Sequence, residues 1–309
     1  MSHPSLGIFF ALITLVLWSL TPFFFRSTGR MIGPFATNLL RLSIAFPVLS
    51  VFCVIQYFWK GSAGMPDGGT ALLLALSGML GLGLGDLLLY RALFRIGPER
   101  SSLLMTLAPA VAAAAAWVAL GEFLSPAQLA GMALILGGVL WTVWKPAVES
   151  PGGAGSGKAA GSRWHGAIDG IGAALCQGFG SVMARQAFLG DANLSPLYAT
   201  AVRVGAGALV IILVARGRGT LVAGWKSLRV PRVLPRMVLG TFSGPIFGMT
   251  CYIAAMKYQP AGVVTTITFM TPLLVMPLGA WRYGTRPTWR VLAGGLAALA
   301  GVILLGWNP

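Results

Sequence analysis

The sequence predicts an all-α polytopic membrane protein with ten transmembrane helices, arranged as two inverted five-helix repeats. Of the 309 residues, 56% are hydrophobic and 9% are charged, and the mean hydropathy is +0.80. A soluble domain would carry about a quarter charged residues. Short sequences of the first half recur in the second half at the same spacing. Because each copy holds an odd number of spans, the second copy would lie upside down relative to the first, with a binding site between the halves.

Ten apolar segments follow one another, each close to the roughly 20 residues with which a helix crosses the hydrocarbon core. They cover residues 7–25, 35–58, 70–93, 101–120, 127–144, 166–184, 196–215, 235–256, 262–283 and 288–307. The first segment lacks a basic start and a small-x-small cleavage site, so it is interpreted as a span rather than a signal peptide. Residues 146–165 are rich in Gly, Ala, Ser and Pro, which is typical of a flexible linker. The predicted units are therefore 1–145, the linker 146–165, and 166–309.

The repeat pairs individual residues of the two halves. The matches align Trp18 with Gln177, Arg41 with Arg203, Tyr90 with Tyr252 and Pro109 with Pro272. A proline within a helix removes a backbone hydrogen bond and bends the helix. Pro109 and Pro272 therefore predict a bend at the same place in both halves, which would act as a hinge or be a passive feature of shape.

The net charge of +15 has an explanation that involves no nucleic acid. Basic residues of membrane proteins gather on cytoplasmic loops, and the odd-numbered loops hold most of the 22 Lys and Arg, which would place both termini outside. Residues 216–236, with Trp225, suit the headgroup region, so membrane lipids are expected partners. Small residues at every fourth position, such as Gly240, Gly244 and Gly248, predict packing seams. A monomer is favoured, and a homodimer is the alternative.

Charged side chains within the spans are candidate binding residues, because ionisable groups in hydrocarbon are costly. Asp86 would bind a substrate amine or a proton, or form a structural ion pair with Arg41. Arg41 and Arg203 would bind a substrate carboxylate or phosphate if they face inward, or extend to the interface if they do not. Glu122, at the end of the fourth span, is expected to satisfy free amides at the following turn.

Four uncharged residues deep in the spans complete the candidate substrate site: Trp18, Tyr90, Gln177 and Tyr252. Aromatic rings and an amide around a shared cavity would suit an amphipathic metabolite. The alternative is that these side chains pack in the core or against lipid.

Patterns for catalysis or cofactor binding are missing from the sequence. His3 and His165 lie outside the spans, and the three cysteines share no ligand-like spacing, so no metal is expected. A Gly-rich phosphate loop ending in GK[ST] does not occur, which argues against direct use of ATP. We therefore expect neither an enzyme nor a cofactor.

Residues 92–141 resemble the C-terminal part of an EamA-type repeat, with an alanine-rich helix, an internal proline, Leu-Gly-Glu at its end and a Gly-rich fifth span; residues 254–305 look like a second copy. The chain is thus similar to ten-helix members of the drug/metabolite transporter superfamily. The resemblance implies a central cavity, alternating access, and export of amino acids or other small metabolites across the bacterial inner membrane. In the second copy Tyr283, Gly284 and Thr285 replace Leu-Gly-Glu, and the first span has no acid like that of the proton-coupled four-helix relatives.

The sequence therefore predicts a secondary transporter that exports small amphipathic metabolites, such as amino acids, without ATP. The first alternative is an exporter of cationic drugs, which would need an available carboxylate such as that of Asp86. A channel and a non-transporting membrane receptor or scaffold remain as further alternatives.

Overall fold

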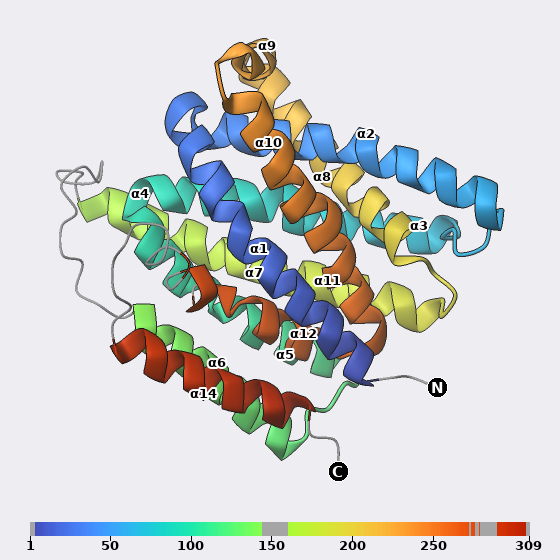
Figure 1. Cartoon of the computed structure of the whole chain (residues 1–309), viewed down its shortest axis with the longest axis vertical. Helices are drawn as coiled ribbons and strands as arrows, with labels where there is room; N and C mark the ends of the chain where they lie inside the picture. Colours follow the sequence, from blue (N-terminus) through green and yellow to red (C-terminus); the bar gives the residue numbers. More distant parts are fainter. Residues whose placement is uncertain (1–3, 144–159, 272, 276–277, 279–288, 307–309) are drawn as a thin grey trace.

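The computed structural model describes residues 4–143, 160–271, 273–275, 278 and 289–306, and every regular element in this part of the chain is a helix (Figure 1). The first half contains α1 (Pro4–Ile32), α2 (Pro34–Lys60), α3 (Gly68–Gly78), the π-helix η1 (Met79–Gly85), α4 (Asp86–Met105), α5 (Leu107–Leu120) and α6 (Pro126–Val143). The second half contains α7 (Ala160–Gly190), α8 (Pro196–Gly217), α9 (Leu221–Lys226), the 3-10 helix η2 (Ser227–Arg229), α10 (Val233–Thr241), the π-helix η3 (Phe242–Ile246), α11 (Phe247–Tyr258), α12 (Ala261–Thr268) and α14 (Trp289–Gly306).

Six helical stretches are long and apolar enough to cross a membrane: Ser5–Ile32, Pro34–Lys60, Gly68–Leu93, Trp164–Gly190, Pro196–Gly217 and Val233–Tyr258. Four shorter apolar helices follow the same order as the remaining predicted spans: Leu107–Leu120, Pro126–Trp141, Ala261–Val275 and Ala293–Leu305. The all-helical membrane architecture is confirmed. Length and composition alone assign six of the predicted ten spans.

Several boundaries differ from the sequence-based expectation. The predicted fourth span begins at residue 101, but α4 continues to Met105. The helix is interrupted at Thr106, and α5 begins at Leu107. Pro109 is the third residue of α5, where the backbone N–H would have no partner within the helix, so it costs no helical hydrogen bond and bends no continuous helix. α7 begins at Ala160, inside the range predicted as linker. Pro272, the other predicted hinge, lies outside the described residues.

Helix ends are set by local chemistry. Gly33 has a φ of 83° and Pro34 follows at the start of α2, so the chain reverses between α1 and α2 without a long loop. Proline suits the first helical position because its ring presets φ and its missing N–H would have no partner there. At the end of α5, Gly121 adopts a left-handed conformation that only glycine takes at no steric cost.

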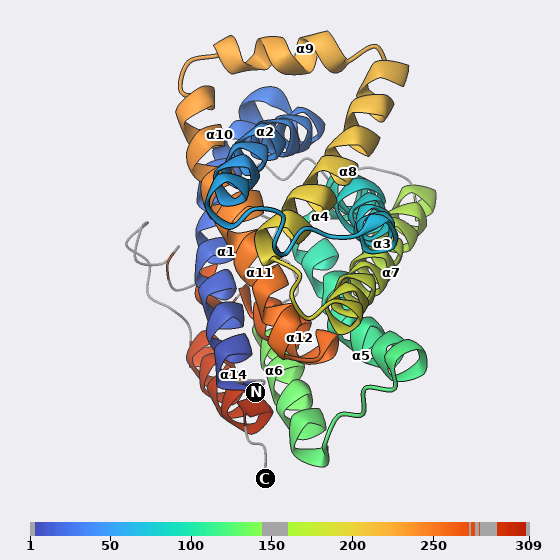
Figure 2. The ribbon, with the colours of Figure 1, turned by 90° about the vertical axis from the view of Figure 1, so that its right-hand side faces the viewer.

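Contacts between loops show that the first helices of the two halves run in opposite directions. Ser195 N donates to Gly64 O at 3.0 Å, and Lys257 Nζ donates to Leu194 O at 3.2 Å. Gly7, near the start of α1, packs against Gln259. The start of α1 and the end of α7 therefore share one end of the bundle, as inverted repeats require. Figures 1 and 2 show the start of α1 and α14 on one side of the molecule and α9 on the opposite side.

The two halves interlock instead of forming separate bodies. α7 packs against α4 and α5, α1 against α11, α2 against α8, and α6 against α14. The α6–α14 pair lies at the edge of the bundle (Figure 2). Its backbones approach so closely that a Cβ atom on Gly138 would lie 2.7 Å from Gly294 O. Such contacts suit helices in lipid, where larger apolar side chains gain little from leaving the hydrocarbon.

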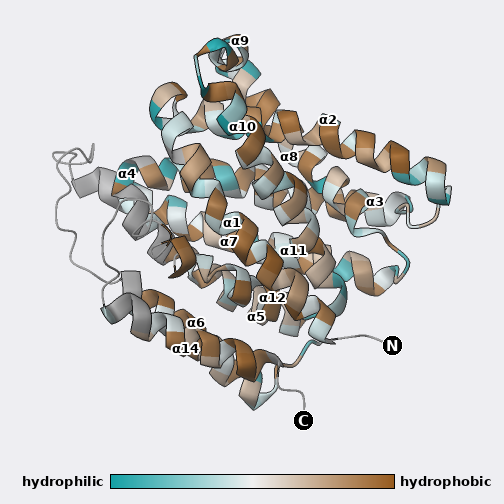
Figure 3. Cartoon of the chain, in the orientation of Figure 1, coloured by the Kyte–Doolittle hydropathy of each residue, from teal (hydrophilic) through white to brown (hydrophobic). Residues whose placement is uncertain are grey.

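The colouring by hydropathy in Figure 3 agrees with a membrane location, since hydrophobic residues cover α2, α6 and α14 while hydrophilic residues gather around α9. In the α9 region Arg216, Lys226 and Arg229 are exposed. Arg218 lies over the ring of Phe35, with its Cζ 5.2 Å from the ring centroid. This basic end is opposite the end that holds the start of α1.

Two π-helices occupy matching positions of the repeat. η1 follows α3 and precedes α4, and η3 follows α10 and precedes α11. Each ends just before the segment that carries the paired residues Tyr90 and Tyr252. π-helical turns are rare and occur often at functional sites, and here both lie beside the candidate residues.

Candidate functional site

Arg41 and Asp86 form an ion pair within the first half. Nη2 of Arg41, on α2, donates to Oδ2 of Asp86, the first residue of α4. Arg41 Nε also donates to Asn38 Oδ1 at 2.8 Å. Asp86 is 5% exposed, and Tyr90, one turn further along α4, is close enough to interact electrostatically with both charges. The two charges therefore neutralise each other, and the ion pair that the sequence suggested between Asp86 and Arg41 is present. The binding of a substrate amine or a proton by Asp86 stays a prediction.

Arg203, the repeat partner of Arg41, has no carboxylate partner among the described residues. It lies on α8, is 1% exposed, and its Nη1 donates to Ser77 Oγ and, at 2.9 Å, to Gly180 O. Its Nε is buried without a hydrogen-bond partner among the described residues. The ion pairs found in this part of the chain involve Arg41, Arg91, Arg95 and Arg185, but not Arg203. At the repeat position of Asp86 the second half has Gly248.

The aromatic candidates Trp18 and Tyr252 meet across the boundary between the halves. Their ring centroids are 5.2 Å apart, and the Tyr252 hydroxyl shares a 2.6 Å hydrogen bond with Ser181 Oγ on α7. A Cβ atom on Gly248 would lie 2.6 Å from Nε1 of Trp18. Gly248 has no side chain at the position where the first half has Asp86. The indole of Trp18 occupies the space that such a side chain would need.

Gln177 lies one helical turn before Ser181, whose Oγ donates to the Gln177 carbonyl at 2.6 Å. It faces Gly81 of η1: a Cβ atom on Gly81 would lie 3.1 Å from Gln177 Oε1 and 3.7 Å from Arg203 Nη2. The glycine therefore lets η1 approach α7 closely and lie next to both the amide and the guanidinium. We call Trp18, Gln177, Ser181, Arg203 and Tyr252 the interface cluster.

The structure thus divides the seven predicted binding residues into two groups. Trp18, Gln177, Arg203 and Tyr252 belong to the interface cluster, whereas Arg41, Asp86 and Tyr90 surround the ion pair of the first half. Sequence reasoning missed Ser77 and Ser181, which hold Arg203 and Tyr252. Their only signal in the sequence is a hydroxyl within an apolar helix, and such hydroxyls more often bond to their own backbone.

Ion pairs join α7 to the first half at both of its ends. Arg185 Nε lies 2.6 Å from Glu122 Oε1, and Arg185 Nη1 donates to the carbonyls of Met256 at 2.7 Å and Lys257 at 3.0 Å. The sequence predicts that Glu122 accepts hydrogen bonds from free amides at the following turn. In the structure its Oε1 pairs with Arg185 instead. Towards the start of α7, Arg95 Nη1 lies 2.5 Å from Asp169 Oδ2.

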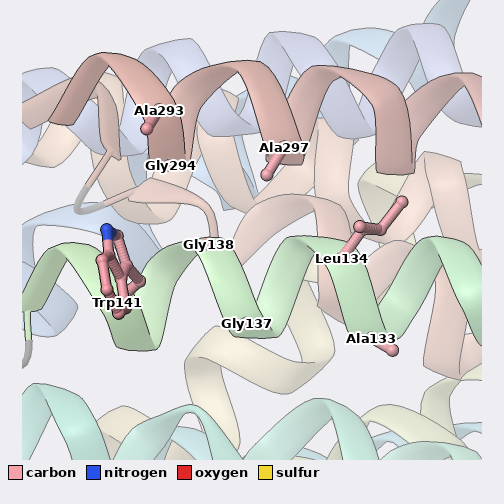
Figure 4. A pocket seen from close by; sticks show the side chains of 8 residues that line it. All are labelled: Ala133, Leu134, Gly137, Gly138, Trp141, Ala293, Gly294 and Ala297. Atoms are coloured by element: carbon pink, nitrogen blue, oxygen red, sulfur yellow. The ribbon is translucent and has the colours of Figure 1, made fainter. Parts of the chain in front are cut away.

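A groove of about 260 Å³ lies on the α6–α14 pair, apart from every candidate residue. Figure 4 shows Trp141 and Leu134 on α6, with Ala293 and Ala297 on α14. Its lining is almost entirely apolar, so it offers no group that would recognise a polar substrate. Within the described residues, no cluster of three or more His, Cys, Asp or Glu side chains could hold a metal ion.

Comparisons with known proteins agree with the repeat. Residues 5–144 and 164–307 each match the EamA-like transporter family. A solved structure titled "Crystal structure of protein" is similar with a TM-score of 0.71 and 18% identity, over 97% of this chain and 96% of that one. At this identity the similarity concerns the fold alone. None of the curated proteins matches the chain.

Proposed function

Because the chain belongs to the EamA-like transporter family, we propose that it is a secondary transporter with ten membrane-crossing helices that exports small amphipathic metabolites, such as amino acids, across the bacterial inner membrane. It works by alternating access and without ATP. The multi-pass membrane location follows from the family and from the apolar helices. The cargo class, the direction and the mechanism rest on the contacts below.

The single observation that supports this proposal most is the contact between the rings of Trp18, from the first half, and Tyr252, from the second. Inverted-repeat transporters bind their substrate at the junction of the halves. The interface cluster offers two aromatic rings for an apolar body, and an amide and a guanidinium for a polar group. These are the contacts that an amphipathic molecule needs.

The ion pairs at the two ends of α7 supply contacts that alternating access would exchange. Arg95–Asp169 and Arg185–Glu122 both join the second half to the first, near opposite ends of the same helix. Opening one end would separate one pair while the other stays closed. The π-helix η1 lies next to Gln177 and Arg203, and η3 leads into α11, whose Gly248 packs against Trp18. This position suits elements whose register changes during the transition.

Reconstitution into liposomes tests this proposal. We expect saturable counterflow of labelled metabolites with no ATP present, and a large loss of flux when Trp18→Ala removes the ring that faces Tyr252. Leakage of unrelated solutes at rates proportional to concentration would instead indicate a channel. Ligand binding without any counterflow would indicate a receptor.

The alternative of a cationic-drug exporter depends on Asp86, the one described carboxylate deep within a span. Its pairing with Arg41 leaves no free negative charge for a cation. Under this alternative, Asp86→Asn abolishes the binding of quaternary amines. Unchanged binding of these drugs by the variant contradicts it.

A further inference from the structure

The charges around the interface cluster do not balance. Arg41 and Asp86 cancel, but Arg203 adds a positive charge that is almost completely buried. No Asp or Glu follows Asp191 in the sequence, so the second half offers Arg203 no acid beyond that residue. The five acids whose side chains are described all have partners elsewhere, as follows: Asp67 with Thr70, Asp86 with Arg41, Glu122 with Arg185, Asp169 with Arg95, and Asp191 with Asn193.

The surroundings of Arg203 compensate its charge only in part. Ser77 Oγ and the Gly180 carbonyl accept hydrogen bonds, and both from the same nitrogen, Nη1. Nε remains without a partner in the described structure. Burying a charge without pairing is strongly unfavourable, and ionisable residues at such depth usually serve a pathway or a ligand. A counter-ion from outside the chain would remove this cost.

The groups that could bind such a counter-ion meet beside η1. A Cβ atom on Gly81 would lie 3.1 Å from Gln177 Oε1 and 3.7 Å from Arg203 Nη2, so the amide and the guanidinium face the same glycine. A guanidinium presents its donors in a planar fork that matches a carboxylate or phosphate. The Gln177 side chain can donate to the same anion through Nε2 when the amide turns this nitrogen, in place of Oε1, towards Gly81. From Gln177, Ser181 on α7 and then Tyr252 on α11 lead towards Trp18. An anionic head at Arg203 would therefore leave the apolar body of the molecule against the two rings.

We propose that the cargo is an organic anion, whose carboxylate or phosphate group binds Arg203 and Gln177 beside Gly81. This inference rests on the proposed transport function and narrows its substrate class. A cation would add to the uncompensated charge, and the ammonium of a zwitterion would find Asp86, the carboxylate that directly follows η1, already bound by Arg41. The cargo therefore carries net negative charge.

A double-mutant cycle tests the need for a counter-ion without any ligand. Gln177→Glu supplies a carboxylate beside Arg203, so we expect the melting temperature of the purified protein to rise by a few degrees. In an Arg203→Gln background the same change should lower the melting temperature, because the new carboxylate is then unpaired. Equal effects in the two backgrounds would overturn the proposal.

A second test uses four probes of similar shape: 3-phenylpropionate, phenyl phosphate, 3-phenylpropionamide and phenethylamine. We expect one or both of the anions to raise the melting temperature of the wild-type protein, and the amide and the amine to have no effect. Arg203→Gln should abolish the shift and Arg203→Lys should keep part of it. Arg229→Gln, the same change at an exposed position of η2, should leave the shift intact. A shift with the amine, or an anion shift that persists in Arg203→Gln, contradicts the proposal.

Flux in liposomes separates the failure of this inference from the failure of the transport function. Counterflow of a neutral or cationic substrate with undiminished rate in Arg203→Gln would overturn the anionic cargo and leave the transporter. Anion binding through Arg203 without any counterflow would overturn the transporter and leave the anion site.

Discussion

Arg41 and Arg203 occupy the same position in the two halves of this protein, yet their surroundings differ. Arg41 is paired with Asp86 and held by Asn38, and its side chain is 17% exposed. Arg203 is more deeply buried, has hydroxyl and carbonyl partners, and lacks a carboxylate in the described structure. The first half thus pairs Arg41 with an acid of its own, whereas Arg203 of the second half has no acid partner among the described residues. Under the anion-binding proposal, equivalent residues of the two repeats would divide a structural role and a binding role between them.

The largest effect that tests this comparison is on stability. Arg41→Gln leaves Asp86 buried and unpaired, which we expect to lower the free energy of unfolding by about 3–5 kcal/mol. Arg203→Gln removes a charge that has no counter-ion, so its effect should be near zero or stabilising. Thermal or denaturant unfolding of both variants in the same detergent measures the difference.

The control for this pair is the double variant Arg41→Gln with Asp86→Asn, which should recover most of the stability lost by Arg41→Gln because no charge is left alone. An equal loss from Arg41→Gln and Arg203→Gln would show that the two arginines play the same role.

A second prediction transfers the acid of the first half to the second. Gly248→Asp places a carboxylate at the repeat position of Asp86, but the Cβ atom would lie 2.5 Å from Ser243 O and 2.6 Å from Trp18 Nε1. Overpacking of this kind costs about 1–3 kcal/mol, so we expect the variant to be less stable despite the new charge. The melting temperature measures the loss.

Relief of the crowding provides the control. Trp18→Ala should reduce the destabilisation by Gly248→Asp, since it removes the indole that occupies the space. A stabilising Gly248→Asp in the presence of Trp18 would mean that the second half tolerates an acid where it now has an aromatic ring.

A third prediction compares the paired tyrosines. Tyr252→Phe removes the hydrogen bond to Ser181, and the loss of one such bond costs about 0.5–1.5 kcal/mol. Ser181→Ala should cost a similar amount, and the double variant should cost less than the sum. Tyr90→Phe removes a hydroxyl with no hydrogen bond in the described structure, so its effect should be smaller than that of Tyr252→Phe. Unfolding experiments on the four variants provide the test.

The smallest expected effect concerns an acid that sits at the protein surface instead of in a span. Asp67 caps α3 and accepts a hydrogen bond from Thr70 N at 2.8 Å, and these bonds lower the pKa of its carboxyl group. The stability that this cap contributes is therefore present above the unfolded pKa and is lost as the pH falls through the folded one. Asp67→Asn keeps the cap without the charge, so the melting temperature of this variant should depend slightly less on pH in the acidic range. An unchanged pH dependence would show that Asp67 does not contribute.

Much of the fold could be predicted because membrane spans are encoded locally. The order of the ten apolar segments, the all-helical class and the repeat all appear in the sequence, and the two family matches to residues 5–144 and 164–307 confirm the repeat. Boundaries inside apolar runs could not be predicted. The break at Thr106 lies between two helices of similar composition, so hydropathy changes little across it. The π-helices are likewise invisible to hydropathy, because an extra residue in a turn leaves the composition unchanged.

The candidate site could be predicted as a set of residue types but not as a set of partners. Ionisable and aromatic residues within spans identified Trp18, Arg41, Asp86, Tyr90, Gln177, Arg203 and Tyr252 without reference to any contact. Which acid each arginine meets depends on packing between helices far apart in the chain. Glu122 illustrates the point, since its partner Arg185 comes from the other half.

By itself the sequence determined that this chain lies in a membrane, that it is built from two related halves, and which few polar side chains the hydrocarbon must accommodate. These properties follow from composition and spacing, because the bilayer is an apolar solvent that a helix crosses only with a long apolar segment. Only the tertiary structure decided that Asp86 is neutralised by Arg41 while Arg203 remains without an acid among the described residues. The physical reason is that a buried charge is governed by neighbours within a few ångströms, and helix packing chooses those neighbours.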